Sequence, residues 1–363
     1  MIWCAKCLQK RHTKTITWCY VCHLFKTMFR LLFILSAMLI GQSSFAQKKL
    51  CIAFYNQENL FETIDDPNKN DNEFLPSAKK VWNTEKYINK IDHMAKVISS
   101  MNEQRAPDII GMCEVENDAV LKDIAAEKQL KNANYQTVQI EGPDERSIDN
   151  GLLFKASLFK LIHSKAIAVH LPNTKTRDIL LVRLEAKNKS QLVVLVNHFP
   201  SRIGGEEASE SKRIVAAQVL RGICDSLYNI NPQENIVIMG DFNDEPTNRS
   251  MDSVLRARAN EYDLNNGNLF NAMYELKQNN EGSHYYKGHF SMLDQIILSS
   301  SMTNCTGAIC YDKSSANIYK QTWMVEAEGK YKGAPLRTFI GEKYTNGYSD
   351  HLPVYIMVTL KKK

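Results

Sequence analysis

Short apolar runs alternate with polar strings along this chain, and the runs have the length of strands rather than helices. Six of them are rich in Ile, Val, Leu and Tyr: residues 50–55, 108–113, 192–196, 235–239, 293–298 and 352–360. Three other segments repeat apolar side chains every three or four positions and predict helices: 84–104, 120–130 and 210–227. Strands that alternate with helices predict an α/β layer architecture.

The helical segments carry their own boundary and packing signals. Asn117 or Asp118 can cap the second helix. The first helix is expected to bury one face, made of Ile88, Ile91, Met94, Ala95, Ile98 and Met101. The third repeats the pattern with Ile214, Ala217, Leu220, Cys224 and Leu227. Because no linker or repeat interrupts residues 47–363, one large domain is the simplest interpretation.

Polar strings adjoin five of the strand-like runs. Four strings follow their run: NQEN at 56–59, CEVEN at 113–117, NHFPSR at 197–202 and GDFND at 240–244. The fifth, SDHLP at 349–353, precedes its run, and Asp294 likewise lies at the start of run 293–298. Open α/β sheets place their chemistry outside strand ends, so a shared rim requires the last two strands to oppose the others. The sheet should therefore be mixed.

These strings carry the residue types that phosphodiester hydrolysis needs: a cation site, an oriented water and donors for developing charge. Glu114 and Asp350 are the natural pair of oxygen ligands for Mg²⁺. Taken alone, each is more simply a surface carboxylate beside a strand. His351, directly after Asp350, favours the functional interpretation because it sets an imidazole beside an acceptor.

Further candidates follow the same logic. If the backbone stays extended, Asp241 and Asn243 point to one side, as a carboxylate that holds water and an amide that donates to phosphate; the alternative is an Asx turn. Asp294 could fix the tautomer of His351. His198 could donate to a phosphate or leaving oxygen, or could be a polar strand end satisfied by local backbone.

In this order the motifs resemble the endonuclease/exonuclease/phosphatase superfamily, and the match spans nearly all of residues 47–363. The resemblance implies a four-layer α/β sandwich of two mixed β-sheets flanked by helices. It implies metal binding by Glu114 and Asp350, with Asn56 contacting metal or phosphate. The remaining implied roles are water activation by Asp241 or His351, phosphate binding by Asn243 and His198, and support of His351 by Asp294.

The amino-terminal segment has a separate character. Residues 1–46 hold six of the 45 Lys and Arg and no Asp or Glu, so the remainder is nearly neutral. A broad basic nucleic-acid surface is not indicated, which favours local recognition of a phosphate. Residues 28–46 have the charged, apolar and small-residue regions of a signal peptide, with cleavage expected after Ala46. The alternative, a membrane anchor, is disfavoured by the short apolar run, and residues 1–27 are interpreted as an upstream extension that is not native.

Cysteines bear on compartment and metal content. Cys4, Cys7, Cys19 and Cys22 are spaced like a zinc knuckle, but a zinc module directly ahead of an export signal makes little topological sense. Three others lie in apolar element interiors and are expected to be buried thiols: Cys51, Cys113 and Cys224. Cys305 and Cys310 could pair after export.

Three segments stay outside the shared set of motifs. Residues 65–73 do not satisfy the EF-hand pattern, because Asp71 and Ser77 replace the required Gly and Glu. Asp149 to Gly151 is compatible with another turn at the active rim, but an ordinary strand-entry turn is favoured. Residues 306–348, with Trp323 and Arg337, match no family motif, and their loops are candidates for substrate selection.

The sequence therefore predicts a secreted or periplasmic, monomeric phosphodiesterase that uses Mg²⁺, with Mn²⁺ or Ca²⁺ as alternatives. The leading hypothesis for its activity is endonuclease cleavage of nucleic acid with low sequence specificity. A phosphatase or a sphingomyelinase-type phospholipase would use the same site. A non-catalytic binding protein of this fold is disfavoured because every expected polar position is filled. No stable membrane anchor is expected.

Overall fold

The computed structural model of this chain describes residues 48–260 and 267–361. The predicted signal peptide, the upstream extension and the four amino-terminal cysteines lie outside these residues. Within the described part, no helix is both long enough and apolar enough to cross a membrane.

The first sheet is built around a parallel central pair, β1 and β2, flanked by antiparallel strands. Its order is β14-β18-β1-β2-β4-β3, and β15 also pairs with β18. The bounds are β14 (Ile309–Tyr311), β18 (Val354–Leu360), β1 (Lys48–Leu60), β2 (Ile109–Val115), β4 (Asp149–Lys155), β3 (Tyr135–Gln139) and β15 (Asn317–Ile318). The final strand, β18, is antiparallel to β1, as its preceding polar string predicted.

The second sheet repeats this plan, with β7 and β8 parallel to each other and β13 antiparallel to β8. Its order is β5-β6-β7-β8-β13-β10-β9. The bounds are β5 (Phe159–Ile167), β6 (Ile179–Ala186), β7 (Gln191–His198), β8 (Ile236–Asp241), β13 (Asp294–Leu298), β10 (Leu269–Asn271) and β9 (Ala257–Arg258). Two hairpins lie apart from both sheets: β11 (His284–Tyr286) with β12 (His289–Ser291), and β16 (Phe339–Ile340) with β17 (Lys343–Tyr344).

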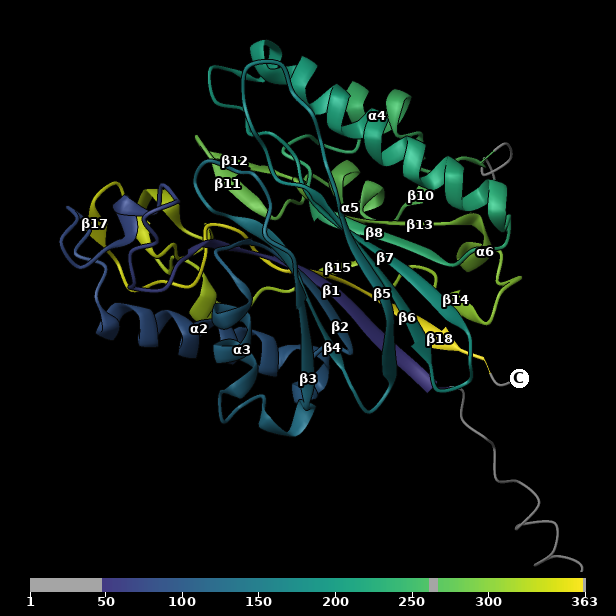
Figure 1. The fold of residues 1–363 in the computed structure, drawn as a ribbon, viewed down its shortest axis with the longest axis horizontal. Helices are drawn as coiled ribbons and strands as arrows, with labels where there is room; N and C mark the ends of the chain where they lie inside the picture. Colours follow the sequence, from purple (N-terminus) through teal and green to yellow (C-terminus); the bar gives the residue numbers. More distant parts are fainter. Residues whose placement is uncertain (1–47, 261–266, 362–363) are drawn as a thin grey trace, which may run out of the picture. The chain divides into compact units, whose positions relative to one another are not determined.

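The two sheets pack face to face, and helices cover their outer faces (Figure 1). Side chains such as Phe54, Phe154 and Val194, all fully buried, fill the space between the sheets. On one outer side α2 (Thr84–Gln104) and α3 (Asp118–Ala126) cover the first sheet, and on the other α4 (Glu206–Ile230) covers the second. Two further α-helices of the described residues are short, α5 (Tyr274–Gln278) and α6 (Ser300–Thr303). The predicted four-layer sandwich of two mixed sheets is confirmed.

The first helix differs from the prediction in one buried position. Ile88 is 56% exposed rather than part of the buried face. At this level of α2 the inward side chain is Lys90, whose Nζ donates to Thr338 Oγ1 and to the carbonyl of Tyr348. The helix therefore packs there against the 338–348 segment through a hydrogen-bonded cation, and Ile88 is left on the open side.

The second and third helices have other bounds than predicted. Asn117 is the cap of α3, since its side chain accepts the N–H groups of Ala119 and Val120. The helix ends at Ala126 instead of Leu130, because Glu127 has extended torsions. Leu130 is nonetheless buried, so it continued the apolar periodicity without being helical. The third helix, α4, extends beyond the predicted segment at both ends.

The cysteines of the described residues behave as expected. Cys51, Cys113 and Cys224 are buried free thiols. Cys305 and Cys310 form a disulfide.

Candidate active site

The polar strings at the strand ends meet at one rim of the two sheets. Cross-strand pairing places Asp241 of β8 opposite both His198 of β7 and Asp294 of β13. From the other sheet, the Nδ2 of Asn56 donates to Asp241 Oδ2 at 3.0 Å. Strands that run in opposite senses thus contribute to the same centre, as the positions of the polar strings predicted.

His351 lies between two carboxylates. Its Nδ1 is 2.6 Å from Asp294 Oδ2, and its Nε2 is 3.7 Å from Asp241 Oδ2. Burial alone would lower the pKa of His351, but Asp294 and Asp241 outweigh burial and raise that pKa well above its usual range. The pairing inferred from strand direction is present, and Asp294 is placed to hold the imidazole in one tautomer.

Asp241 is held from two sides, and its neighbour Asn243 departs from the extended geometry that was expected. Asp241 Oδ1 accepts the backbone N–H of Asn243 at 2.9 Å, which is the Asx turn considered as the alternative. Asn243 has a φ of 50°, in the left-handed region that Asn tolerates. Its amide donates to the carbonyl of Phe199 instead of lying beside the Asp241 carboxylate. The common orientation of the two side chains was therefore a wrong expectation.

The side chain of Asn56 links Asp241 to the backbone of β1, the strand that carries Asn56. While its Nδ2 donates to Asp241, its Oδ1 accepts the N–H of Glu58 at 2.9 Å. Ser349 Oγ donates to the Asn56 carbonyl and accepts the N–H of His351. Asn56 therefore orients Asp241 directly, and the implied contact with metal or phosphate stays a prediction.

His198 is not satisfied by local backbone. It is buried, and its Nδ1 has no hydrogen-bond partner among the described residues. Its Nε2 lies 3.8 Å from Asp241 Oδ2 and 3.9 Å from Glu114 Oε1. Burial, with the nearby charges of Arg177 and Arg146, lowers the pKa of His198 well below its usual value. A neutral imidazole that ends its strand and faces two carboxylates fits a donor to substrate better than a strand end satisfied by local backbone.

Glu114 and Asp350 supply hard oxygen donors to the same rim. Glu114 Oε2 accepts the backbone N–H of Asn59 at 2.8 Å. Burial and then repulsion from Asp350 raise the pKa of Glu114, and a cation between the two carboxylates would relieve that repulsion. Oxygen donors of this kind fit a divalent cation such as Mg²⁺ or Mn²⁺.

Gly240 brings β8 close to its neighbour at the point where Asp241 enters the site. A Cβ on Gly240 would lie 2.3 Å from the carbonyl oxygen of Asn197. Glycine is therefore required by the close approach of two backbones rather than by a positive φ.

Sequence reasoning missed several residues of this centre. The ring of His284 lies 4.6 Å from that of His351, and His284, Asp350 and His351 have ligand atoms within 4.8 Å of one another. Arg337 Nη2 donates to Asp350 Oδ2 at 2.6 Å. His284 comes from the β11 hairpin and Arg337 from a loop, so neither follows a strand end. Two of them had a signal in the sequence: Glu58 belongs to the NQEN string and lies 3.7 Å from Arg337 Nε, and Arg337 belongs to the 306–348 stretch whose loops were candidates for substrate selection.

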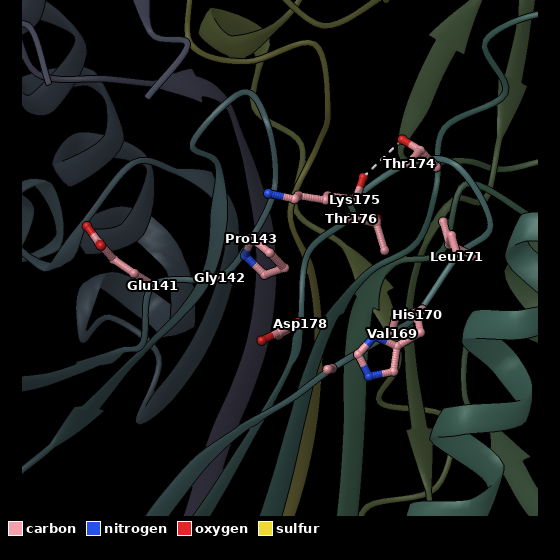
Figure 2. A pocket seen from close by; sticks show the side chains of 11 residues that line it. Glu141, Gly142, Pro143, Val169, His170, Leu171, Thr174, Lys175, Thr176 and Asp178 are labelled. Atoms are coloured by element: carbon pink, nitrogen blue, oxygen red, sulfur yellow. Dashed lines mark hydrogen bonds between the residues drawn. The ribbon is translucent and has the colours of Figure 1, made fainter. Parts of the chain in front are cut away.

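A separate cavity of about 580 Å³ lies between residues 141–143 and the segment 168–178 (Figure 2). Lys175 and His170 line it on one side, and Glu141 lies on the other. Arg177, within the same segment, directs its guanidinium to Asp144 and to the carbonyl of Phe199. Among the described residues, none of the candidate catalytic side chains lines this cavity.

Most of the other segments singled out in the sequence have structural roles. Asp149 accepts hydrogen bonds from the Gly142 N–H and from Gln139 Nε2, as expected of a strand entry. Residues 65–71 form a loop with turns, and residues 72 and 73 begin the short 3-10 helix Asn72–Phe74. Trp323 packs against Tyr348, with ring centroids 5.0 Å apart. Of the two residues named in the unassigned stretch, only Arg337 reaches the centre.

Comparison with known proteins places this geometry in a family. Residues 51–360 match the model of the Endonuclease/Exonuclease/phosphatase family. No curated protein matches the chain.

Solved structures share the fold at low sequence identity. One is D. rerio TDP2 complexed with single strand DNA product, at 16% identity and a TM-score of 0.52, covering 86% of this chain and 99% of that chain. Another is an endonuclease/exonuclease/phosphatase family protein from Bacteroides thetaiotaomicron, at 15% and 0.51, covering 87% and 99%. The mannosyl-6-phosphatase Bt3783 of the same organism matches at 15% and 0.50, covering 85% and 99%. At such identities the likeness shows the fold alone.

Proposed function

Since the chain belongs to the endonuclease/exonuclease/phosphatase family, whose members are divalent-metal-dependent hydrolases of phosphate esters, we propose that it cleaves phosphodiesters and that its substrate is nucleic acid. In detail, it is a secreted or periplasmic, monomeric, Mg²⁺-dependent endonuclease of low sequence specificity. The observation that carries this proposal is the convergence of Glu114, Asp241 and His351 at one rim, with Asp294 behind the imidazole.

The residues divide the chemistry among them. Glu114 and Asp350 would hold the divalent cation, which would neutralise non-bridging oxygens and lower the pKa of a water. Asp241, held by Asn56, accepts a hydrogen bond from the attacking water. Either Asp241 or His351 is the general base. His198 donates to the phosphate or to the leaving oxygen, since its neutral ring faces the centre.

Nucleic acid is favoured as the substrate over other phosphate esters by one comparison. D. rerio TDP2, of the same fold, is described in complex with a single strand DNA product. The near-neutral balance of residues 47–363 fits recognition at one phosphate rather than along a wide basic surface. The mannosyl-6-phosphatase of the same fold supports a second candidate function, hydrolysis of a phosphate monoester.

Export is supported by two features of different kinds. The signal-like pattern of residues 28–46 predicts a mature chain that begins at Gln47. The disulfide between Cys305 and Cys310 fits an oxidising compartment. Mass spectrometry should therefore show that the exported protein begins at Gln47 and contains no stoichiometric zinc. Retention of residues 1–27 or a bound zinc would contradict this.

A substrate panel tests the proposed activity. Purified protein with Mg²⁺ should nick circular plasmid DNA and hydrolyse an aryl phosphodiester, and Glu114→Ala should do neither. RNA, sphingomyelin, inositol phosphates and a sugar monophosphate are assayed beside DNA. Faster turnover of a monoester than of DNA would show that the protein is a phosphatase rather than an endonuclease. Binding of these esters without turnover would show a non-catalytic protein.

A further inference from the structure

The most informative residue outside the family motifs is Arg337. It belongs to a stretch, residues 306–348, that carries none of the five polar strings. Nevertheless its Nη2 donates to Asp350 Oδ2 at 2.6 Å, and its Nε lies 3.7 Å from Glu58 Oε1. The structure therefore brings one cation from the unassigned stretch directly to a carboxylate of the proposed metal centre.

The backbone around Arg337 is held by contacts from two segments, the loop that follows β17 and the end of β1. Thr345 Oγ1 donates to the Arg337 carbonyl, and a Cβ on Gly347 would lie 2.1 Å from the same oxygen. On the other side, Glu58 Oε2 accepts the N–H of Thr338 at 2.6 Å. The guanidinium is thus carried by a braced loop, which reduces the ordering cost when it binds a ligand.

A buried cation completes this brace. Lys90 is 1% exposed, and its Nζ donates to Thr338 Oγ1 at 2.6 Å and to the Tyr348 carbonyl at 2.5 Å. Lys90 therefore ties the Arg337 loop, the segment before Asp350 and helix α2 together. A loop that only covered the surface would not need such a connection.

The guanidinium of Arg337 uses only part of its hydrogen-bonding capacity. Of its five N–H groups, one at Nη2 forms a hydrogen bond, to Asp350, and within the described residues the others form none. Its side chain is 43% exposed, whereas Glu58 is buried. A partly exposed arginine whose backbone is held in place and whose guanidinium keeps unused donors has the geometry for recognising phosphate oxygens.

We propose that Arg337 binds a non-bridging oxygen of the substrate phosphate beside Asp350, so that the unassigned stretch contributes a substrate-binding residue to the centre. This inference rests on the proposed phosphate-ester hydrolysis and adds a binding group to it. Asp350 holds Arg337 ready before the substrate arrives. The ligand class is the phosphate group itself, so inorganic phosphate is a suitable probe.

Calorimetric titration of inorganic phosphate tests the proposal on the full chain at saturating Mg²⁺. Arg337→Ala should weaken phosphate affinity about tenfold to a hundredfold, as expected for the loss of a charged hydrogen-bond donor. Arg337→Lys should fall between, because lysine keeps the charge and loses the planar fork. In kinetics with an aryl phosphodiester, KM should rise in the same order as phosphate affinity falls.

Arg183→Ala is the matched control. Arg183 Nη1 pairs with Glu234 Oε1 at 2.9 Å, and Glu234 precedes β8 at the end opposite to Asp241. Phosphate affinity should be unchanged in this variant.

Two results would overturn the proposal. One is unchanged phosphate affinity in Arg337→Ala and Arg337→Lys; the other is a shift confined to the Mg²⁺ concentration needed, which would show that Arg337 only orients Asp350. If Arg337→Ala does not fold by circular dichroism, Arg337→Lys decides alone. Absence of hydrolysis by the unaltered protein would refute the proposed function, while phosphate titration would still test Arg337.

Discussion

The contact between Asp294 and His351 gives the sharpest test of the proton-handling groups. Asp294 is fully buried, its Oδ2 lies 2.6 Å from His351 Nδ1, and its backbone N–H is held separately by Ser283 Oγ. Asp294→Asn therefore removes a charge and leaves the side-chain shape and the backbone contact. If Asp294 works only through the imidazole, its replacement matters only while His351 is present.

The magnitude follows from the kind of hydrogen bond that is exchanged. A bond to a charged partner contributes about 1.5–3 kcal/mol and a neutral one about 0.5–1.5 kcal/mol. Replacing the first by the second in the transition state costs about 1.4 kcal/mol, or about tenfold in rate. His351→Ala removes a proton-transfer group and should cost about 10²–10⁴. The double variant should then be no slower than His351→Ala alone.

The assay is kcat/KM for an aryl phosphodiester at saturating Mg²⁺, with the two single variants and the double variant compared in one cycle. Asp312→Asn is the control, because Asp312 accepts a hydrogen bond from Thr359 at the other end of β18 and should not affect the rate. A double variant about tenfold slower than His351→Ala would show that the two residues act independently and would refute the pairing.

Three further predictions concern stability. Gly240→Ala should lower the free energy of unfolding by about 1–3 kcal/mol, because the new Cβ would meet the Asn197 carbonyl at 2.3 Å; an unchanged denaturant midpoint would contradict this. Burial raises the pKa of Asp149 from 3.8 to about 7, so the folded chain binds this proton more tightly than the unfolded chain does. Protonated Asp149 therefore stabilises the folded state fully below about pH 4, and this contribution is lost as the pH rises through 7. Asp149→Asn should flatten the loss of stability between about pH 4 and 7, measured by urea unfolding at several pH values; an equal slope in both proteins would refute it. Cys310→Ser should cost about 2 kcal/mol in an oxidising buffer, and the reduced wild type should show the same loss; no difference between oxidised wild type and the variant would be the contrary result.

Strand direction was predictable because a polar string marks the rim end of its strand. For β13 and β18 the string comes first, and both are antiparallel to their central neighbours. That direction placed Asp294 and His351 at one rim, and the family resemblance implied that they pair. The position of the polar residues relative to a strand therefore predicts the direction of that strand even when the neighbouring strands are unknown.

Other features depend on contacts that no local pattern reports. His284 reaches His351 through a hairpin, and Arg337 reaches Asp350 through a loop braced by Lys90. The exposure of Ile88 depends on the same brace, because Lys90 takes the inward position. Asn243 could not be oriented from spacing, since its left-handed φ breaks the alternation of an extended strand.

The central claim is that Glu114 and Asp350 hold a divalent cation used in phosphate-ester hydrolysis. The most direct test is the Mg²⁺ dependence of aryl phosphodiester turnover for the unaltered protein, Glu114→Ala and Asp350→Ala, with circular dichroism to verify folding. Chelation should abolish turnover and Mg²⁺ should restore it in the unaltered protein. Both variants should fold, bind Mg²⁺ weakly and be nearly inactive. Turnover that survives chelation, or Mg²⁺ curves in both variants that match the unaltered protein, would contradict the account.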